Sequence, residues 1–317
     1  MSPAEPLADI PVANGKILVI RGGAIGDFIL TLPVLAALRQ QFPKAHLEVL
    51  GYPHIASLAL HGGLADAVRP VEARALAGFF ADMGDLDDAT GHYFAGFQVI
   101  VSYLYDPDGF FAENVRACTK AQFIAGPHRP DETKPVHATD VLLKPLERLA
   151  IFDADPVPRL SFGESGQVAP VLAVHPGSGS EKKNWPQPHW AKFLAHVMSG
   201  TDWNVLLVGG EAEGNRLAEL AQPLPSSRVR LSQNQPLPEL AKSLRTCLGF
   251  IGHDSGITHL AAAVGLTGLA LWANSNEAVW HPRSPAFRVL RNSDGIAHLS
   301  PETVFTVLRN VLPQRPA

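Results

Sequence analysis

Three stretches of the sequence place chemically capable side chains directly after a short apolar run. The stretches are Lys16–Arg39, His175–Pro186 and His253–Leu260. In the first and third, the apolar run ends in a glycine-bearing turn and helical periodicity follows, which predicts a strand, a turn and a helix in that order. In the second, a polar loop of small residues separates the run from its helix. The N-terminus of a helix favours anions, so these stretches suit acids, phosphates or both. We call them the first, second and third corners, in chain order.

Asp27 is the acid of the first corner. It follows Gly22, Gly23 and Gly26, whose lack of side chains lets the backbone come close to a ligand. Aspartate at the start of a helix is a common cap, and it is also a common general base. The sequence pattern leaves both roles open, and they are compatible if the carboxylate points into a site.

The second corner combines small residues with lysine. Ser178, Gly179 and Ser180 offer backbone amides and hydroxyls, and Lys183 offers a positive charge. This combination is typical of diphosphate binding, and the competing interpretation is a solvent-exposed loop. Glu211 follows another apolar run and is either an acid that binds ribose hydroxyls or a favourable charge in the first turn of a helix.

The third corner offers a second phosphate site. Asp254, Ser255 and Gly256 lie where a helix should begin, so free amides and the helix dipole would favour a phosphate there. The alternative is a simple helix cap by Asp254 or Ser255. His259 is either a buried histidine or one that supports the site.

Several classes of function lack their signatures. The first turn is neither G-x-G-x-x-G nor a P-loop, and no spacing typical of a metal site or of a serine hydrolase elbow occurs. We therefore expect no cofactor and no metal. The formal net charge of −4 gives no indication of nucleic-acid binding. The two cysteines are far apart, and residues 1–15 lack the pattern of a signal peptide, so we expect a cytoplasmic protein.

The elements alternate between strand and helix over 317 residues, which predicts two α/β domains with parallel sheets. We place the N-terminal domain at 1–160 and the C-terminal domain at 161–317, joined by the proline-rich segment 152–170. Continuous helices are expected from the first corner to about Leu38, over 138–150 and over 211–221. Residues 82–91 are expected to form a loop, and Tyr105–Gly109 a turn after a strand.

The combined motifs resemble glycosyltransferase family 9, the ADP-heptose:lipopolysaccharide heptosyltransferase family. The resemblance rests on R-G-G-A-I-G-D-F-I-L-T-L-P, H-P-G-S-G with K-N-W-P, G-G-E after a strand, and H-D-S-G-I-T-H-L-A-A-A, in this order. It implies a GT-B fold, in which two Rossmann-like domains face each other across a cleft. The N-terminal domain would hold the acceptor and the C-terminal domain the nucleotide sugar, and the terminal helix could pack back on the N-terminal domain.

The resemblance also implies residue roles. Asp27 would be the general base, with Gly22, Gly23 and Gly26 on the acceptor side. The donor would be bound by Ser178, Gly179, Ser180, Lys183, Glu211, Asp254, Ser255, Gly256 and His259. The chain departs from the family pattern at Gly22, Gly23 and His253, and its Tyr105–Gly109 turn has no family counterpart that we recognise. The acceptor is therefore not assigned.

The expected activity is an inverting transfer of a sugar, heptose from ADP-heptose by the resemblance, to a lipopolysaccharide-core or other glycan or glycolipid acceptor. Peripheral contact with the cytoplasmic face of the inner membrane stays open. A nucleotide-sugar epimerase of the same architecture, or a nucleotide-sugar-binding protein without turnover, is the alternative. Product analysis with donor alone distinguishes them, because an epimerase needs no acceptor.

Overall fold

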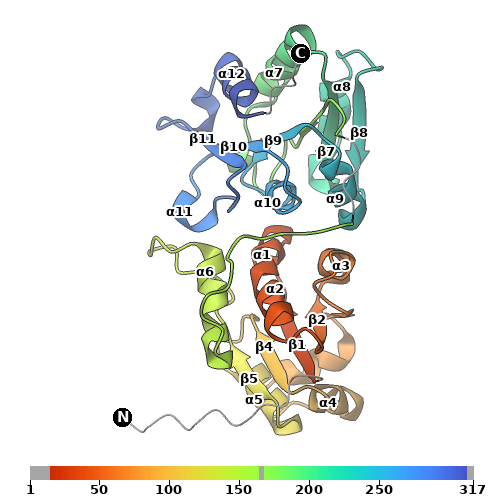
Figure 1. The fold of residues 1–317 in the computed structure, drawn as a ribbon, viewed down its shortest axis with the longest axis vertical. Coiled ribbons are helices and arrows are strands. Elements are labelled where there is room, and N and C mark those ends of the chain that lie inside the picture. The colour runs from red at the N-terminus through yellow and green to blue at the C-terminus, as the bar shows by residue number, and fades with distance from the viewer. Residues whose placement is uncertain (1–14, 164–167, 313–317) are drawn as a thin grey trace. The chain divides into compact units, whose positions relative to one another are not determined.

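The computed structural model describes residues 15–163 and 168–312, which form two units (Figure 1). The first unit runs to Gly23 and includes Leu32–Arg129 and Val141–Asp155. The second contains Ala24–Thr31, Pro130–Asp140 and the chain from Pro156. Two short segments of the expected N-terminal domain are thus grouped with the second unit. Residues 1–14, and residues 164–167 of the expected linker, lie outside the described residues.

The first unit is built on a five-stranded parallel sheet with the order β3-β2-β1-β4-β5. Its strands are β1 (Lys16–Arg21), β2 (His46–Gly51), β3 (Ala67–Pro70), β4 (Val99–Ser102) and β5 (Gln122–Ala125). β1 lies at the centre, where both faces of a parallel sheet are covered, and this explains its uninterrupted apolar run Ile17–Ile20.

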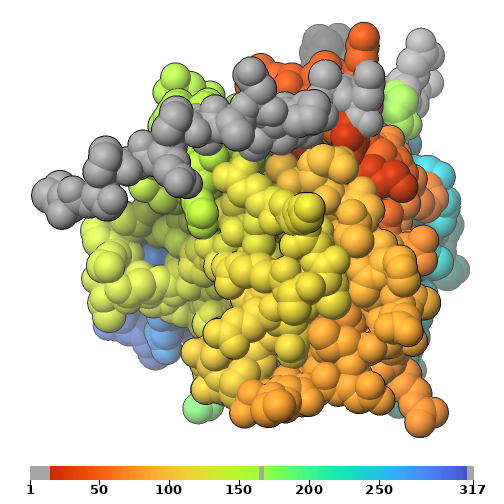
Figure 2. All heavy atoms as spheres, turned by 90° about the horizontal axis from the view of Figure 1, so that it is seen from below, coloured from red at the N-terminus to blue at the C-terminus, as the bar shows by residue number. Residues whose placement is uncertain are grey.

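Helices cover this sheet. The helices in the first half of the chain are α1 (Ile25–Ile29), α2 (Leu32–Gln41), α3 (Pro53–His61), α4 (Asp88–Ala95), α5 (Phe110–Cys118) and α6 (Ala138–Leu143), with 3₁₀ turns at Arg74–Phe80 and Lys144–Leu149. Of these, α1 and the first part of α6 belong to the second unit. On one face, the aromatic side chains of Phe79, Phe94 and Phe111 pack against Leu18 and Ile100 of the strands. Figure 2 looks onto a face formed mainly by the orange and yellow segments of this unit.

The second unit is built on a six-stranded parallel sheet with the order β11-β10-β9-β6-β7-β8. Its strands are β6 (Val171–Val174), β7 (Asn204–Gly209), β8 (Val229–Gln233), β9 (Gly249–His253), β10 (Gly268–Trp272) and β11 (Phe287–Arg291). The order matches the doubly wound arrangement of Rossmann folds, and the first sheet repeats it with one strand fewer.

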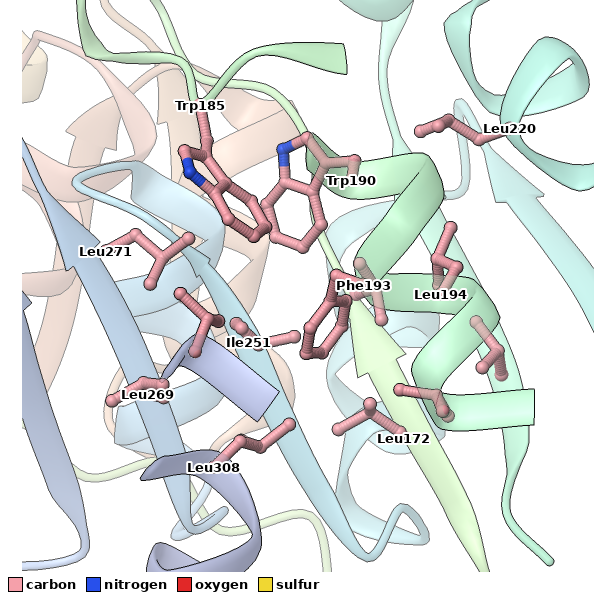
Figure 3. Close-up of a cluster of buried hydrophobic side chains, with 14 of the residues drawn as sticks. Leu172, Trp185, Trp190, Phe193, Leu194, Leu220, Ile251, Leu269, Leu271 and Leu308 are labelled. Atoms are coloured by element: carbon pink, nitrogen blue, oxygen red, sulfur yellow. The ribbon is translucent and has the colours of Figure 1, made fainter. Parts of the chain in front are cut away.

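A core of the second unit lies between this sheet and three helices from its early, middle and terminal parts. The helices here are α7 (Gln187–Gly200), α8 (Arg216–Ala221), α9 (Leu237–Arg245), α10 (Gly256–Ala263), α11 (Glu277–Trp280) and α12 (Pro301–Val311), with 3₁₀ turns at Glu181–Lys183, Glu211–Glu213 and Ile296–His298. Figure 3 shows Trp185, Trp190 and Phe193 packed over Ile251 of β9. α12 joins this core through Leu308, so the terminal helix packs on α7 and β10 of the second unit.

The expectation of one continuous helix in the first corner is wrong. The chain forms α1 and then α2, with a break at Leu30–Thr31. Pro33 has no N–H to donate to the carbonyl of Ile29, so the hydrogen-bond ladder of a single helix cannot pass this point. The N–H of Thr31 instead donates to the carbonyl of Phe28, three residues back. Asp27 therefore lies on a short, separate helix.

Three other expectations are wrong for related reasons. The helix expected over 138–150 changes to a 3₁₀ turn near Pro145, which again lacks a donor. The helix expected over 211–221 is divided at Gly214 into a 3₁₀ turn and α8. The loop expected over 82–91 contains the start of α4, because the carboxylate of Asp87 accepts the N–H of Thr90 and caps the helix.

The strand order reverses once in each sheet, and we call the carboxyl ends of the two strands at that point the crevice of the unit. Ligands of doubly wound folds bind at the carboxyl ends of the strands where the strand order reverses, between loops that leave in opposite directions. In the first unit this point lies between β1 and β4, and in the second between β6 and β9. In the part of the chain that the structure describes, no helix is long and apolar enough to span a membrane.

Candidate functional site

The crevice of the second unit brings the second and third corners together. Lys183 comes from the loop after β6, and Asp254 follows β9, the neighbouring strand. The Nζ of Lys183 lies 2.6 Å from Oδ2 of Asp254, whose carboxylate also accepts a hydrogen bond from the hydroxyl of Ser275. The Lys183 side chain is 39% exposed, so its ammonium group is accessible to a ligand while Asp254 holds its direction.

His253 ties the loop to β9. The N–H of Trp185 donates to Nε2 of His253 at 2.9 Å, so the proton of the ring must be on Nδ1, which donates to the carbonyl of Gly177 at 3.1 Å. Burial lowers the pKa of His253 to about 3, which keeps the imidazole neutral. The histidine thus fixes both ends of the segment from Gly177 to Trp185.

The loop also has internal support. The hydroxyl of Ser178 lies 2.8 Å from the carbonyl oxygen of Ser180 and 2.7 Å from Oδ1 of Asn184. Gly177 is the glycine that packing requires, because a Cβ there would lie 1.9 Å from Oε1 of Glu213. Gly179 is exposed, and a Cβ on it would meet nothing within 4 Å, so sterics alone do not require glycine at this position.

A second buried histidine supports the start of α10. Nδ1 of His175 lies 3.2 Å from the hydroxyl of Ser255, and its Nε2 lies 3.7 Å from Oε1 of Glu213. Burial lowers the pKa of His175 to about 4. The carboxylate favours the ring proton on Nε2, so Nδ1 accepts from Ser255. The hydroxyl of Ser255 also accepts the N–H of Thr258, which makes Ser255 the cap of α10.

α1 packs against α10 at two glycines, within the second unit. A Cβ on Gly256 would lie 2.7 Å from Cβ of Ile25 and 2.9 Å from the nitrogen of Gly26. A Cβ on Gly26 would be in ordinary contact with His259, at 3.4 Å from Cδ2. The backbones of the two helices therefore approach so closely that the helix of Asp27 lies against the first turn of α10.

Asp27 caps its own helix. Its Oδ2 accepts the N–H of Ala24 at 2.9 Å, and its carbonyl accepts the hydroxyl of Thr31 at 2.8 Å. The side chain is only partly buried, which leaves part of the carboxylate accessible. The capping role left open by the sequence is thus present, and it does not exclude a second role for the same carboxylate.

His259 is a buried histidine that interacts electrostatically with both Asp254 and Asp27. Burial lowers its pKa to about 4, while the negative charges of Asp254 and Asp27 oppose this shift. The charges of His137 and His281, like burial, lower the pKa of His259. The two carboxylates of the candidate site are therefore near enough to one buried imidazole to influence its protonation, although they come from corners that are far apart in the sequence.

The segment Pro130–Asp140 completes this part of the second unit. The N–H of Thr139 donates to Nδ1 of His137, so Nε2 carries the proton and donates to the carbonyl of His281 at 2.9 Å. Arg283 lies 2.6 Å from Asp140 and 2.9 Å from the hydroxyl of Thr139. These contacts attach the segment to the region of α11, which the sequence did not indicate.

The other expected site residues belong to other segments. Glu211 is exposed at the start of its 3₁₀ turn, whereas Glu213, two residues later, is buried and accepts the N–H of Gly210. Gly22 and Gly23 follow β1 in the first unit, and Gly23 has a φ of 97°, which glycine adopts without strain. Among residues 15–163 and 168–312, no cluster of three or more His, Cys, Asp or Glu side chains could hold a metal.

Sequence reasoning missed the buried support of the site. His175, His253 and Glu213 had no assigned role, yet they hold the loop after β6 and the start of α10. One signal was present in the sequence. Both histidines stand at the carboxyl end of an apolar run, which is where a parallel sheet positions its site residues.

The two units, each built on a parallel sheet with the doubly wound strand order, have the fold of the GT-B class of glycosyltransferases. Residues 154–303 match the family model of glycosyltransferase family 9 (heptosyltransferase). The resemblance inferred from the motifs is confirmed over this part of the chain, and the chain is a glycosyltransferase.

Solved structures share the fold at low sequence identity. A family 9 glycosyltransferase from Veillonella parvula is 17% identical, with a TM-score of 0.74 over 94% of this chain and 97% of its own. The E. coli ADP-heptose lipopolysaccharide heptosyltransferase II is 16% identical, with a TM-score of 0.73 over 93% and 98%. The GT-B fold expected from the sequence is confirmed.

Two proteins related in sequence differ in how much of their length this chain matches. A putative glycosyltransferase of Haemophilus influenzae is 22% identical over 84% of this chain and 86% of its own length. Lipopolysaccharide heptosyltransferase 1 of Pseudomonas aeruginosa is 34% identical, but only over 41% of this chain and 33% of its own length. The chain therefore matches about a third of this heptosyltransferase, and its donor and acceptor need their own argument.

Proposed function

We propose that the protein is an inverting glycosyltransferase that moves a sugar from a nucleotide diphosphate sugar to a glycan or glycolipid acceptor. By the family resemblance, the donor is ADP-heptose and the acceptor a lipopolysaccharide core. The proposal locates the reaction in the cytoplasm, with any membrane contact peripheral. The observation that carries it is the convergence in one unit of Lys183, the first turn of α10 and the helix of Asp27.

The donor diphosphate would bind at the crevice between β6 and β9. Lys183 supplies the positive charge, and its pairing with Asp254 directs the ammonium group before a donor arrives. The first N–H groups of α10 have no partners within the helix and favour an anion. Because the hydroxyl of Ser255 is held by His175, we assign the phosphate contact to these amides rather than to the hydroxyl.

Asp27 would act as the general base. It would take the proton of an acceptor hydroxyl while that oxygen attacks the anomeric carbon on the face opposite the diphosphate, and the bond from that carbon to the phosphate oxygen breaks. The diphosphate leaves with the electron pair, and Lys183 and the amides of α10 stabilise its charge. The close packing of α1 on α10 keeps the base near the leaving-group site.

The test is the variant Asp27→Asn. Asparagine retains an oxygen that can accept the N–H of Ala24, so we expect an intact helix. We expect turnover to fall by about 100- to 10,000-fold because proton removal is lost. The measurement is ADP release from ADP-heptose with a heptose-free lipopolysaccharide core, beside the affinity for ADP by calorimetry.

Near wild-type turnover in Asp27→Asn would exclude the base assignment. Loss of ADP affinity together with turnover would indicate a damaged fold instead, and Thr31→Val is a control that removes only the hydroxyl bonded to the Asp27 carbonyl. A changed donor sugar in the absence of any acceptor would favour an epimerase over a transferase.

A further inference from the structure

The crevice of the first unit carries an aromatic side chain that the proposed function does not use. The strand order reverses between β1 and β4, so the loops after these strands flank a predicted ligand position. The loop after β1 contains Gly22 and Gly23. The loop after β4 contains Tyr105, which is 67% exposed. An exposed tyrosine at such a position is available to a ligand.

The three strand ends in this crevice are joined by one buried arginine. Arg21 ends β1 and is 4% exposed. Its NH1 donates to the carbonyl of His128, beyond β5, at 2.7 Å and lies 3.4 Å from the carbonyl of Tyr103, beyond β4. The guanidinium of Arg21 thus bonds within the protein. It links the backbone of Tyr103, two residues before Tyr105, to the backbone of His128.

The ring of Tyr105 is supported from the side and from its own loop. Its centroid lies 4.6 Å from that of His128, with 61° between the planes. The next residue, Asp106, accepts the N–H groups of Phe111 and Ala112 at the start of α5, at 3.2 and 2.9 Å. The loop next to Tyr105 is therefore anchored to a helix, and the contact with His128 orients the ring.

Exposed, preordered aromatic rings suit one class of ligand in particular. A sugar ring has an apolar face of C–H groups and a rim of hydroxyls, and the apolar face packs on an aromatic ring while the hydroxyls stay hydrated or find polar partners. Little conformational entropy is lost on binding, since the protein side is already ordered.

We propose that the ring of Tyr105, supported at its side by His128, forms a platform on which one sugar ring of the acceptor packs. The proposal rests on the proposed function, because it identifies the acceptor as a saccharide recognised partly through an apolar ring face. It makes Tyr105 a specificity-determining residue.

The test compares Tyr105→Ala, Tyr105→Phe and His128→Ala with the wild-type protein. We expect Tyr105→Ala to raise the acceptor KM by about tenfold, with the donor KM and the affinity for ADP unchanged. Tyr105→Phe keeps the ring and should stay within about twofold of the wild type. His128→Ala keeps the carbonyl bonded to Arg21 and should raise the acceptor KM by about threefold.

Phe152→Ala is the matched control. Phe152 is 68% exposed and belongs to the same unit. It follows Arg148, whose carbonyl accepts the Gln122 side chain at the amino end of β5, the end opposite to His128. Its removal should leave the acceptor KM unchanged.

The outcomes separate this proposal from the proposed function. An unchanged acceptor KM in Tyr105→Ala, or an equal effect of Phe152→Ala, overturns the platform and leaves the transferase assignment intact. If the wild-type protein transfers no sugar, the proposed function fails. The platform is then judged by saturation-transfer NMR with a deacylated, heptose-free core oligosaccharide and ADP. Signals from sugar C–H groups that vanish in Tyr105→Ala support it, and signals that are absent or unchanged overturn it.

Discussion

Glu211 and Glu213 differ in role although two residues separate them. Glu213 is 7% exposed, accepts the N–H of Gly210 and faces His175, so its carboxylate belongs to the support of the site. Glu211 is exposed and is the acid available to a nucleoside. The sequence indicated an acid in this turn, and the structure shows it exposed, but the sequence gave no sign that the second glutamate is structural.

This difference predicts opposite effects of two alanine variants. Glu213→Ala should lower the free energy of unfolding by about 1–3 kcal/mol, because the partly buried N–H of Gly210 loses its acceptor. Glu211→Ala should leave unfolding unchanged and weaken ADP binding by about tenfold if the acid holds the ribose. Urea unfolding and ADP calorimetry on both variants check this. Equal stability of the two variants would contradict the structural role of Glu213.

At the scale of elements, the contact between α1 and α10 determines where Asp27 lies. Each helix is short, and neither could fix the direction of the other by propensity alone. Gly26 and Gly256 let the backbones approach, yet the space around them is unequal.

Gly256→Ala should therefore be much more harmful than Gly26→Ala. The added methyl of the former would collide with Ile25 and the Gly26 backbone, and we expect a loss of about 1–3 kcal/mol in the stability of the second unit. The latter meets only ordinary contacts, and alanine is favoured over glycine within a helix by up to about 1 kcal/mol. Denaturant unfolding of both variants is the measurement, and a Gly26→Ala variant as unstable as Gly256→Ala would show that the described helix contact is wrong.

At the scale of the whole molecule, buried histidines are concentrated in the second unit. Four are buried, namely His137, His175, His253 and His259. Burial lowers the pKa of His253 to about 3 and those of the other three to about 4. Three of them also carry hydrogen bonds that fix the site, so their neutral form is part of its architecture.

The second unit should therefore lose stability on mild acidification. Above a pH of about 6.5 each imidazole is neutral in both states, and below it the unfolded chain binds protons that the folded chain excludes down to about pH 4. Each such histidine lowers the free energy of unfolding by at most about 1.4 kcal/mol per pH unit in this window. Glu181 and Glu302 have carboxyl pKa values below their usual range, so their protonation reduces the stability of the folded state only at still lower pH.

Tryptophan fluorescence measures this unit alone. All five tryptophans lie in the second unit, and all four tyrosines lie in the first. We expect the urea midpoint from tryptophan emission to fall clearly between about pH 7 and about pH 5. A midpoint that does not change over this interval would show that the four histidines are not held neutral in the folded state.

The sequence by itself determined the class of fold, the three corners and the kinds of residue that stand in them. Strand and helix periodicity is local, and a glycine turn before a helix is visible without any tertiary information. The break that leaves Asp27 on a separate short helix was encoded in the sequence by Pro33, and we did not infer it. The sequence could not show which of two neighbouring glutamates is buried. It also left the roles of His175 and His253 unassigned.

Only the tertiary structure decided which corners meet. Lys183 and Asp254 are 71 residues apart, and His137 and His281 are 144 apart. Parallel strand order brings such residues to one sheet edge, and no local pattern encodes which strands are neighbours. The first corner is divided in the same way by tertiary contacts. Its turn at Gly22–Gly23 belongs to the first unit, whereas α1 packs on α10 in the second unit. Gly26 and Gly256, which are distant in the sequence, leave room for that contact.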